Sequence, residues 1–442
     1  MSDGAGRAAR YQDVFGHSLA RRLVIADAIS YLGDFVGLGA LLLVAYDRSG
    51  GPLGPAAVFG VQALPAVLVA TGIGPWLDRI PRIKGLASLC LTGAAALCLP
   101  LVFGGLWPVL ATAAIIGSVR TAYNSIRSGA MADGVPRTIR ARLLALNNVS
   151  YSVSEVLGYF AGSTVALATG ARPAIIADAV TFLLAALLFT GVGEPVRSQS
   201  RGRASLTTGI RTIFADPTLA MLVPVIWAGL ALGAVPATLA TTALHGSYRG
   251  WVPLAMAVTA IGLAVAGVAV GRTDLAERVP GQLQYIVAEG ACFLLAALGL
   301  KITPLLIVAG NLAAGAGMGW TVAAQTTFVL VVPADRIANV TSVMIATLIV
   351  LEGAGALVFG AVANSMGVPA AYLLAGVMLV VAGLVGALYG RRRPMAFDVQ
   401  RPLGAPVGPA PAGPAPAGPA PAGPAAAGQP PASSPPGELP RP

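Results

Sequence analysis

Long apolar stretches separated by short polar gaps occupy most of the chain. A helix that crosses a bilayer needs roughly 20 apolar residues, and membrane helices tolerate the Gly and Pro that several stretches contain. The pattern therefore predicts an all-α membrane protein with twelve transmembrane helices. The stretches lie at about 22–46, 54–76, 85–106, 108–130, 143–168, 173–193, 217–243, 251–271, 282–300, 303–330, 339–364 and 369–390.

Basic residues in the gaps gather on one side of the predicted bilayer. An even number of spans places both termini on that side, which carries the arginines near 7–22, 79–84, 137–142, 197–211 and 391–393. Loops rich in Lys and Arg stay in the cytoplasm. We therefore expect a multi-pass protein of the plasma membrane with cytoplasmic N- and C-termini. The opposite side carries only Arg48, Arg172, Arg249 and Lys301.

The polar gaps also divide the chain into parts. A cytoplasmic linker, 194–216, separates an N-terminal set of spans, 22–193, from a C-terminal set, 217–390. Residues 1–21 form a polar cytoplasmic N-terminus, and the span after them lacks a small-residue cleavage site, so we expect it to be retained. The Pro/Ala/Gly-rich tail, 391–442, repeats "PAGPA". Because that composition cannot bury a core, we expect the tail to be disordered.

The two sets of spans repeat one another at a constant spacing. "VPRTIRARL" begins at Val135 and "VPADRIANV" at Val332, an offset of 332 − 135 = 197. The same offset relates Glu155 to Glu352 in the fifth span of each set. Repeated halves are typical of transporters in which two bundles move about a site near the midplane. We infer two pseudo-symmetric six-helix bundles.

Composition excludes several classes of function. The chain is 56% hydrophobic and 10% charged, against about 25% charged in soluble proteins. Its net charge of +10 lies in the gaps rather than on a basic amphipathic helix, so we expect no nucleic-acid partner. Neither a phosphate-binding loop nor a catalytic arrangement of side chains is evident, which predicts a non-enzyme without a cofactor. The scattered Cys90, Cys98, Cys292, His17 and His245 predict no disulfide framework and no metal site.

Charged residues inside the predicted spans are functional candidates, because burying charge in a bilayer is costly. Asp34 lies about twelve residues from the cytoplasmic end of its span, roughly 18 Å deep at 1.5 Å per residue. Asp27 precedes it by seven residues and can share its face. Arg120 falls at similar depth and should find an acid, so we expect a direct pair with Glu155 or with Asp34.

Two further charges depend on their neighbours. Arg127 is closer to the cytoplasm than Arg120, and we expect it to pair or snorkel there. Glu352 has no Lys or Arg at its depth in its own half, because Gly317 stands where Arg120 stands in the first half. Our hypothesis is that Glu155 is held by a salt bridge while Glu352 carries a proton. The alternative is a protonated Glu352 that only supports helix packing.

One gap carries a family resemblance. The stretch "GPWLDRIPRIK", 74–84, resembles the cytoplasmic signature loop of the major facilitator superfamily, although Pro81 stands where that loop usually has Gly. The stretches "AISYLGDFV", "QALP" and "DAVTFLLAALLF" are similar to its drug-efflux members, in particular the enterobactin-exporter-like and macrolide-efflux-like transporters. The resemblance implies a conformational latch at the cytoplasmic face. Its residues are Gly74, Asp78, Arg79, Arg82 and Lys84.

The resemblance also implies which spans line a central cavity. Span 1 lines it, which makes Asp34 the first candidate for proton coupling or cation binding; the alternative is a packing role. Asn124 follows Arg120 where the family often has a Gln-Gly-like pair. Asn311 and Gln325, with Trp320, are candidate cavity groups in span 10, whereas Asp178 and Glu289 lie on helices that are peripheral in this fold. Tyr159 stands where antiporters often have Pro, which weakens the inference of antiport but not of transport.

These observations lead to one main prediction of function. We expect a secondary transporter that exports a small molecule, either drug-like or a secondary metabolite, by alternating access and proton-coupled antiport. We expect it to work as a monomer in the lipid bilayer. A proton-coupled importer or symporter on the same fold is the first alternative. The second is a non-transporting membrane sensor or scaffold that uses the Pro-rich tail.

Overall fold

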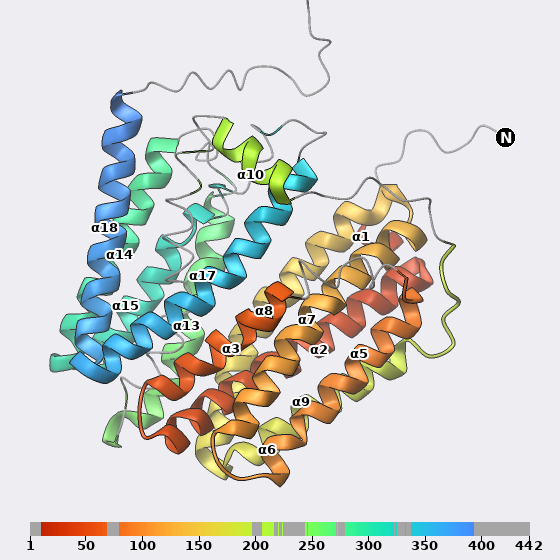
Figure 1. The fold of residues 1–442 in the computed structure, drawn as a ribbon, viewed down its shortest axis with the longest axis horizontal. Coiled ribbons are helices and arrows are strands. Elements are labelled where there is room, and N and C mark those ends of the chain that lie inside the picture. The colour runs from red at the N-terminus through yellow and green to blue at the C-terminus, as the bar shows by residue number, and fades with distance from the viewer. Residues whose placement is uncertain are drawn as a thin grey trace, which may run out of the picture. The chain divides into compact units, whose positions relative to one another are not determined.

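The computed structural model describes most of the membrane-spanning part of the chain (Figure 1). The chain divides into two compact units, 1–397 and 398–442, and the second lies outside the described residues. The described residues are 10–68, 79–196, 206–215, 246–270, 279–321, 323–324 and 337–392, together with Ala220, Val223, Leu244, Arg272 and Val332.

Helices account for nearly all of these residues. Where the chain is described, each apolar stretch predicted from the sequence coincides largely with helix; 69–76, most of 217–243 and 325–330 lie outside the described residues. In the first half the helices are α1 (Tyr11–Gly16), α2 (Ser18–Ser49), α3 (Leu53–Leu68), α5 (Arg82–Leu97), α6 (Leu99–Val102), α7 (Trp107–Gly134), α8 (Arg137–Thr169) and α9 (Ala171–Leu188). They are followed by α10 (Leu206–Ala215), the 3-10 turn η2 (Gly246–Trp251), α13 (Val252–Val270), α14 (Val279–Ile302), α15 (Pro304–Gly317), α17 (Ile337–Met366) and α18 (Val368–Arg392).

Small residues let the helices of the first half approach closely. Helix α2 packs against α8 and α9. A Cβ on Gly158 or Gly162 of α8 would overlap Phe35 or the Val36 carbonyl of α2. The four-residue spacing of these glycines is one that lets helices approach closely, and the structure shows that approach here. On the other side of α2, Gly37 leaves room for the side chain of Asp178 from α9.

The second half forms its own packed group and also contacts the first half. Helix α14 packs on α15 and α18, which lie side by side with it in Figure 1, and α13 packs on α15. Two pairs cross between the halves, α3 with α17 and α8 with α13. In the first pair a Cβ on Gly353 or Gly360 of α17 would overlap Ala63 or Ala56 of α3. These glycines therefore set how closely the two halves meet.

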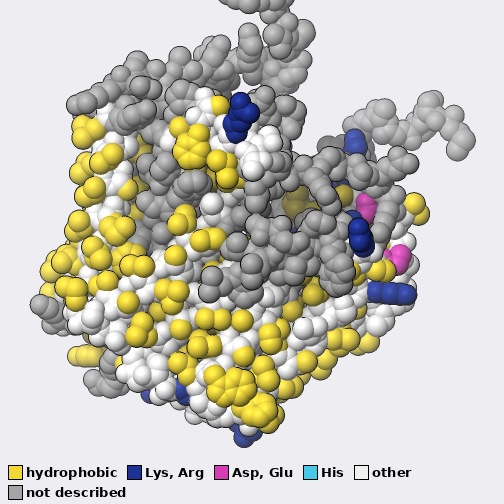
Figure 2. Space-filling view, in the orientation of Figure 1, with side chains coloured by type: hydrophobic (Ala, Val, Ile, Leu, Met, Phe, Trp, Pro, Cys, Tyr) yellow, Lys and Arg dark blue, Asp and Glu magenta, His cyan; other side chains and the backbone are white. Residues whose placement is uncertain are grey.

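The outer surface of the helices is apolar. Among the coloured side chains of Figure 2, hydrophobic ones predominate and few charged ones are seen. Among the described residues, seven helical segments are long and apolar enough to cross a membrane. The long helices α7 and α8 carry the charged residues Arg120, Arg127 and Glu155, of which Arg127 is buried and the other two are partly exposed. An apolar outer surface of this extent would be unfavourable in water and suits contact with lipid.

Candidate functional site

Arg120 lies midway along α7 and is held by aromatic side chains. Its Nη2 donates a hydrogen bond to the Tyr151 hydroxyl at 3.1 Å. Its guanidinium carbon lies 5.5 Å from the centroid of the Tyr151 ring and 5.9 Å from that of Phe35, within the range of cation–π attraction. Within the described ranges Arg120 forms no ion pair. The expected direct pair with Glu155 or Asp34 is therefore wrong, because the aromatic groups of α2 and α8 occupy the nearest positions.

The aromatic group around Arg120 comes from two helices. The Tyr151 ring meets Tyr31 edge-on at 5.3 Å and Phe35 at 5.2 Å, and Phe35 meets Tyr159 at 5.1 Å. We call Tyr31, Phe35, Tyr151 and Tyr159 the aromatic wall. Sequence reasoning missed it, although the i, i+4 spacing of Tyr31 and Phe35 was a signal, since such residues share a helix face. Edge-to-face pairs of this kind fix ring orientation and add to the free energy of packing.

Three carboxyl groups lie within the electrostatic range of Arg120. Its charge acts on Asp34 of α2, on Glu155 of α8 and on Glu352 of α17. Each of these residues is partly exposed and lies near the middle of its helix. Glu155 and Glu352 also interact with each other. The repeated glutamates of the two halves thus face one shared site, whereas the sequence suggested that Arg120 would serve only one of them.

Asp27 belongs to a separate and closed ion pair. Its Oδ2 lies 2.8 Å from Nε of Arg127, and its Oδ1 accepts a hydrogen bond from the Tyr123 hydroxyl at 2.9 Å. Asp27 and Arg127 are both buried. The pairing of Arg127 confirms one of its two predicted behaviours. Because Asp27 is already paired and inaccessible, the structure separates it from the more open group around Arg120.

Asp34 has a second acidic neighbour that the sequence interpretation treated as structural. Asp178 of α9 is buried in the space that Gly33 and Gly37 leave on α2, one and three residues from Asp34. The charges of the two carboxyl groups act on each other. Oδ1 of Asp34 and Oδ1 of Asp178 are buried and have no hydrogen-bond partner among the described residues.

The candidates of the second half occupy packed positions. Asn311 is fully buried, where its Nδ2 donates to the Ala255 carbonyl at 3.4 Å and its Oδ1 accepts from the Tyr372 hydroxyl at 3.2 Å. Trp320 is also buried, and its Nε1 donates to Glu289 at 2.8 Å. The expectation that Asn311 and Trp320 line a cavity is therefore wrong, because they join helices to one another.

Two other candidates are placed differently. Asn124 is exposed, one turn beyond Arg120 on α7. Gln325 lies outside the described residues.

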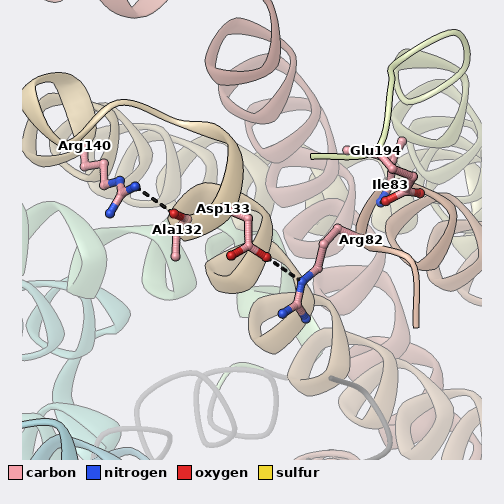
Figure 3. Close-up of polar contacts among 6 residues, drawn as sticks. All are labelled: Arg82, Ile83, Ala132, Asp133, Arg140 and Glu194. Atoms are coloured by element: carbon pink, nitrogen blue, oxygen red, sulfur yellow. Dashed lines mark hydrogen bonds and ion pairs between the residues drawn. The ribbon is translucent and has the colours of Figure 1, made fainter. Parts of the chain in front are cut away.

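Polar contacts also join the helix ends at the Arg82 side of the first half (Figure 3). Nε of Arg82 lies 3.2 Å from Oδ2 of Asp133, at the end of α7. Arg140 donates to the Val135 and Ala132 carbonyls at 2.7 Å and so closes the turn between α7 and α8. Asp133 was not among the residues singled out in the sequence, although it lies just before the Val-Pro that marks the repeat.

The loop that resembles the family signature is described only from Arg79 onward. Gly74 and Asp78 lie outside the described residues. Oε2 of Glu194 accepts from the backbone N–H of Ile83 at 3.1 Å, and Oε1 accepts from that of Lys84 at 3.0 Å. The first N–H groups of a helix have no partner within it and favour a carboxylate. Glu194 therefore ties the start of α5 to the segment that follows α9.

The opposite ends of the helices carry an ion pair between the two halves. Nη2 of Arg249 in η2 donates to both carboxylate oxygens of Asp47, near the end of α2, at 2.9 and 2.7 Å. Both side chains are about half exposed, at 45% and 51%. The neighbouring Arg48 donates to the Gly105 carbonyl at 2.6 Å within the first half. The structure thus holds the halves together at the end remote from Arg82.

Comparisons with known proteins agree on the fold. A family model described as Major Facilitator Superfamily matches residues 23–351. A bacterial homolog of the human lysosomal transporter Spinster, in an inward-facing and unoccupied conformation, has 16% sequence identity and a TM-score of 0.66, with 87% of this chain and 98% of that chain covered. The nucleoside transporter NupG has 14% identity and a TM-score of 0.66, with 83% and 98% covered.

A POT family transporter in complex with a thioalcohol-conjugated peptide has 12% identity and a TM-score of 0.65, with 84% of this chain and 96% of that chain covered. A search of curated protein sequences finds no match. Likeness at these identities establishes the fold, whereas the family model covers well over half of the chain. The chain belongs to the Major Facilitator Superfamily and has the fold of a multi-pass membrane transporter.

Proposed function

We propose that the protein is a proton-coupled secondary transporter that exports a small amphipathic molecule across the plasma membrane. The group formed by Arg120, Asp34, Glu155 and Glu352 is the observation that carries this proposal. It places charge from both halves at mid-helix depth. Charged groups at such depth are costly, and those without an ion-pair partner point to an ion or substrate pathway. Export is the direction suggested by the resemblance of the first half to drug-efflux transporters.

The charged group supports a cycle of alternating access. A proton and a substrate that compete for the same carboxylates cannot be bound at the same time. The inward movement of a proton is therefore coupled to the outward movement of the substrate. Movement of one half against the other exposes the site first to one side and then to the opposite side. The Asp47–Arg249 pair must open when the halves separate at its end. The Arg82–Asp133 pair supports the opposite end, as the resemblance of the signature loop to a latch implies.

Several finer points belong to the same proposal. The termini and the Arg-rich gaps lie in the cytoplasm, the protein acts as a monomer, and the proton gradient takes the place of a cofactor. Gly74 and Asp78 complete the latch with Arg79, Arg82 and Lys84. Asp34 is the first residue we expect to exchange a proton, because it is partly exposed and has an unpartnered carboxylate oxygen among the described residues.

Flux in membrane vesicles tests the proposal. Inverted vesicles that contain the protein are energised, and the uptake of ethidium, tetraphenylphosphonium and erythromycin is followed before and after a protonophore collapses the gradient. We expect gradient-dependent uptake that Asp34→Asn abolishes. The matched control Asp13→Asn makes the same chemical change on α1, outside the spans, and should retain uptake.

The outcomes separate the alternatives. Gradient-dependent loss of compound from the vesicle lumen would favour an importer or symporter. Equal flux with and without the gradient for wild type and Asp34→Asn would refute proton coupling. Deletion of 393–442 tests the scaffold alternative, because a transporter keeps its flux without the tail.

A further inference from the structure

The guanidinium of Arg120 has hydrogen-bonding capacity that the protein leaves unused. An arginine carries five N–H donors in a planar fork. One of them bonds Tyr151, and in the part of the chain that the structure describes no other acceptor is within hydrogen-bonding distance of the rest. Arg127, on the same helix, has its carboxylate partner at 2.8 Å. Arg120 is also partly exposed. A fork that is fixed on one side and open on the other suits a bidentate anion such as a carboxylate.

The glutamates supply the opposite charge at the same place. Tyr151, which bonds Arg120, lies within the electrostatic range of both Glu155 and Glu352. Neither glutamate forms a hydrogen bond or ion pair within the described ranges, and both are partly exposed. With Asp34 included, one positive group stands among three acidic ones. A purely anionic ligand would therefore meet repulsion, whereas a ligand with an additional amine would not.

Tyr151 is the partly exposed member of the aromatic wall and provides an apolar surface beside these charges, while the buried Tyr31, Phe35 and Tyr159 support it. Phe35 and Tyr151 lie on the guanidinium, and their T-shaped contact holds both rings in place. A preformed wall of this kind loses little conformational entropy on binding an apolar ring. It also accounts for why Arg120 keeps its orientation without a carboxylate partner.

We infer that the transported molecule is an amphipathic zwitterion, with its anionic group on Arg120, its amine at Glu352 and its apolar body against Tyr151. This inference rests on the proposed transport function and deepens it by naming the substrate class. Glu352 belongs to α17 and Arg120 to α7, so the ligand contacts both halves at once. A proton that neutralises Glu352 competes with the amine, which couples substrate release to proton entry.

A series of ligands with one aromatic body and four charge states tests the inference. The probes are tryptophan, N-acetyltryptophan, tryptophanamide and N-acetyltryptophanamide, which are zwitterionic, anionic, cationic and neutral. Binding to the full purified chain is measured by calorimetry and by the shift in melting temperature at equal ligand concentration. We expect tryptophan to bind at least tenfold more tightly than N-acetyltryptophanamide. Charge-assisted hydrogen bonds change affinity by about ten- to a hundredfold.

Two variants assign the two ends of the ligand. Arg120→Gln should make tryptophan and tryptophanamide bind equally, and Glu352→Gln should make tryptophan and N-acetyltryptophan bind equally. Arg120→Lys keeps the charge without the fork and should retain part of the preference for the carboxylate. The control Arg172→Gln removes an arginine at the start of α9 and should leave the charge preferences as in wild type. The melting temperature without ligand shows that each variant is folded.

The result that overturns the inference is distinct from failure of the transport proposal. If the four probes bind in order of hydrophobicity alone, or if neither variant alters the order, the zwitterion site is refuted. Proton-coupled flux of other compounds would then still stand. If the charge preferences appear as described but no compound moves with the gradient, the binding site stands and transport fails.

Discussion

The ion pair between Asp47 and Arg249 should control how often the halves separate at their end of the molecule. It is the described ion pair that joins the two halves, and both of its side chains are about half exposed. Replacing either partner by a neutral polar residue, in Asp47→Asn or Arg249→Gln, removes the attraction without changing the fold. Each change should therefore shift the protein toward the conformation that is open at this end.

The size of the shift follows from the exposure of the pair. Exposed ion pairs contribute about 0.2–1 kcal/mol, and the contact of one nitrogen with both oxygens favours the upper part of that range. Since about 1.4 kcal/mol corresponds to a tenfold change, the ratio of open to closed molecules should rise by about 1.5- to 5-fold. Salt at 1 M reduces the Debye length to about 3 Å and should bring wild type close to the variants.

Distances between spin labels measure this ratio. Labels at Thr169→Cys, at the end of α8, and Met366→Cys, at the end of α17, report on the two halves. The native cysteines Cys90, Cys98 and Cys292 are first replaced. Wild type should show mainly the short distance, and both single variants should show more of the long one.

A double-mutant cycle decides whether the pair itself is responsible. The double variant Asp47→Asn/Arg249→Gln should show nearly the same shift as either single variant, because the interaction is lost once. Shifts that simply add, or distances that do not respond to either variant at low salt, would refute the assigned role.

Three further substitutions test other parts of the structure. Asp27→Asn should lower the free energy of unfolding by about 3–5 kcal/mol, because it leaves the buried Arg127 unpaired. The double variant Asp27→Asn/Arg127→Gln should recover part of this loss in thermal unfolding. If it recovers none, the closed pair is contradicted. Glu194→Gln weakens the cap on α5 and should lower the free energy of unfolding by about 0.5–1 kcal/mol, a small loss because the side chain is exposed. An unchanged melting temperature would exclude the cap. Gly162→Leu places side-chain atoms against the Val36 carbonyl and should lower the free energy of unfolding by about 1–3 kcal/mol in thermal unfolding. An unchanged stability would show that α2 and α8 adjust freely.

Much of the architecture was readable from the sequence. Bilayer thickness sets the length of an apolar stretch, so the predicted spans and the helices largely coincide wherever the chain is described. The four-residue spacing of Gly158 and Gly162 indicates that a neighbouring helix approaches closely, because a missing side chain acts locally, but it does not say that the neighbour is α2. The repeat of Glu155 and Glu352 was also visible, since it needs only a constant offset along the chain.

The partners of the charges were decided by the tertiary structure. A sequence gives the depth of Arg120 in the bilayer but not the rotation of α7 relative to α2 and α8, and that rotation brings Tyr151 rather than Glu155 within 3.1 Å of Arg120. Asn311 is a second example. Its depth along the helix was compatible with a cavity position, but in the structure it is packed against Tyr372. Depth follows from chain length and hydrophobicity, which are one-dimensional. Which groups a charged side chain faces depends on how side chains from separate helices fit together. Only the folded chain therefore shows that the glutamates of both halves lie within the electrostatic range of Arg120.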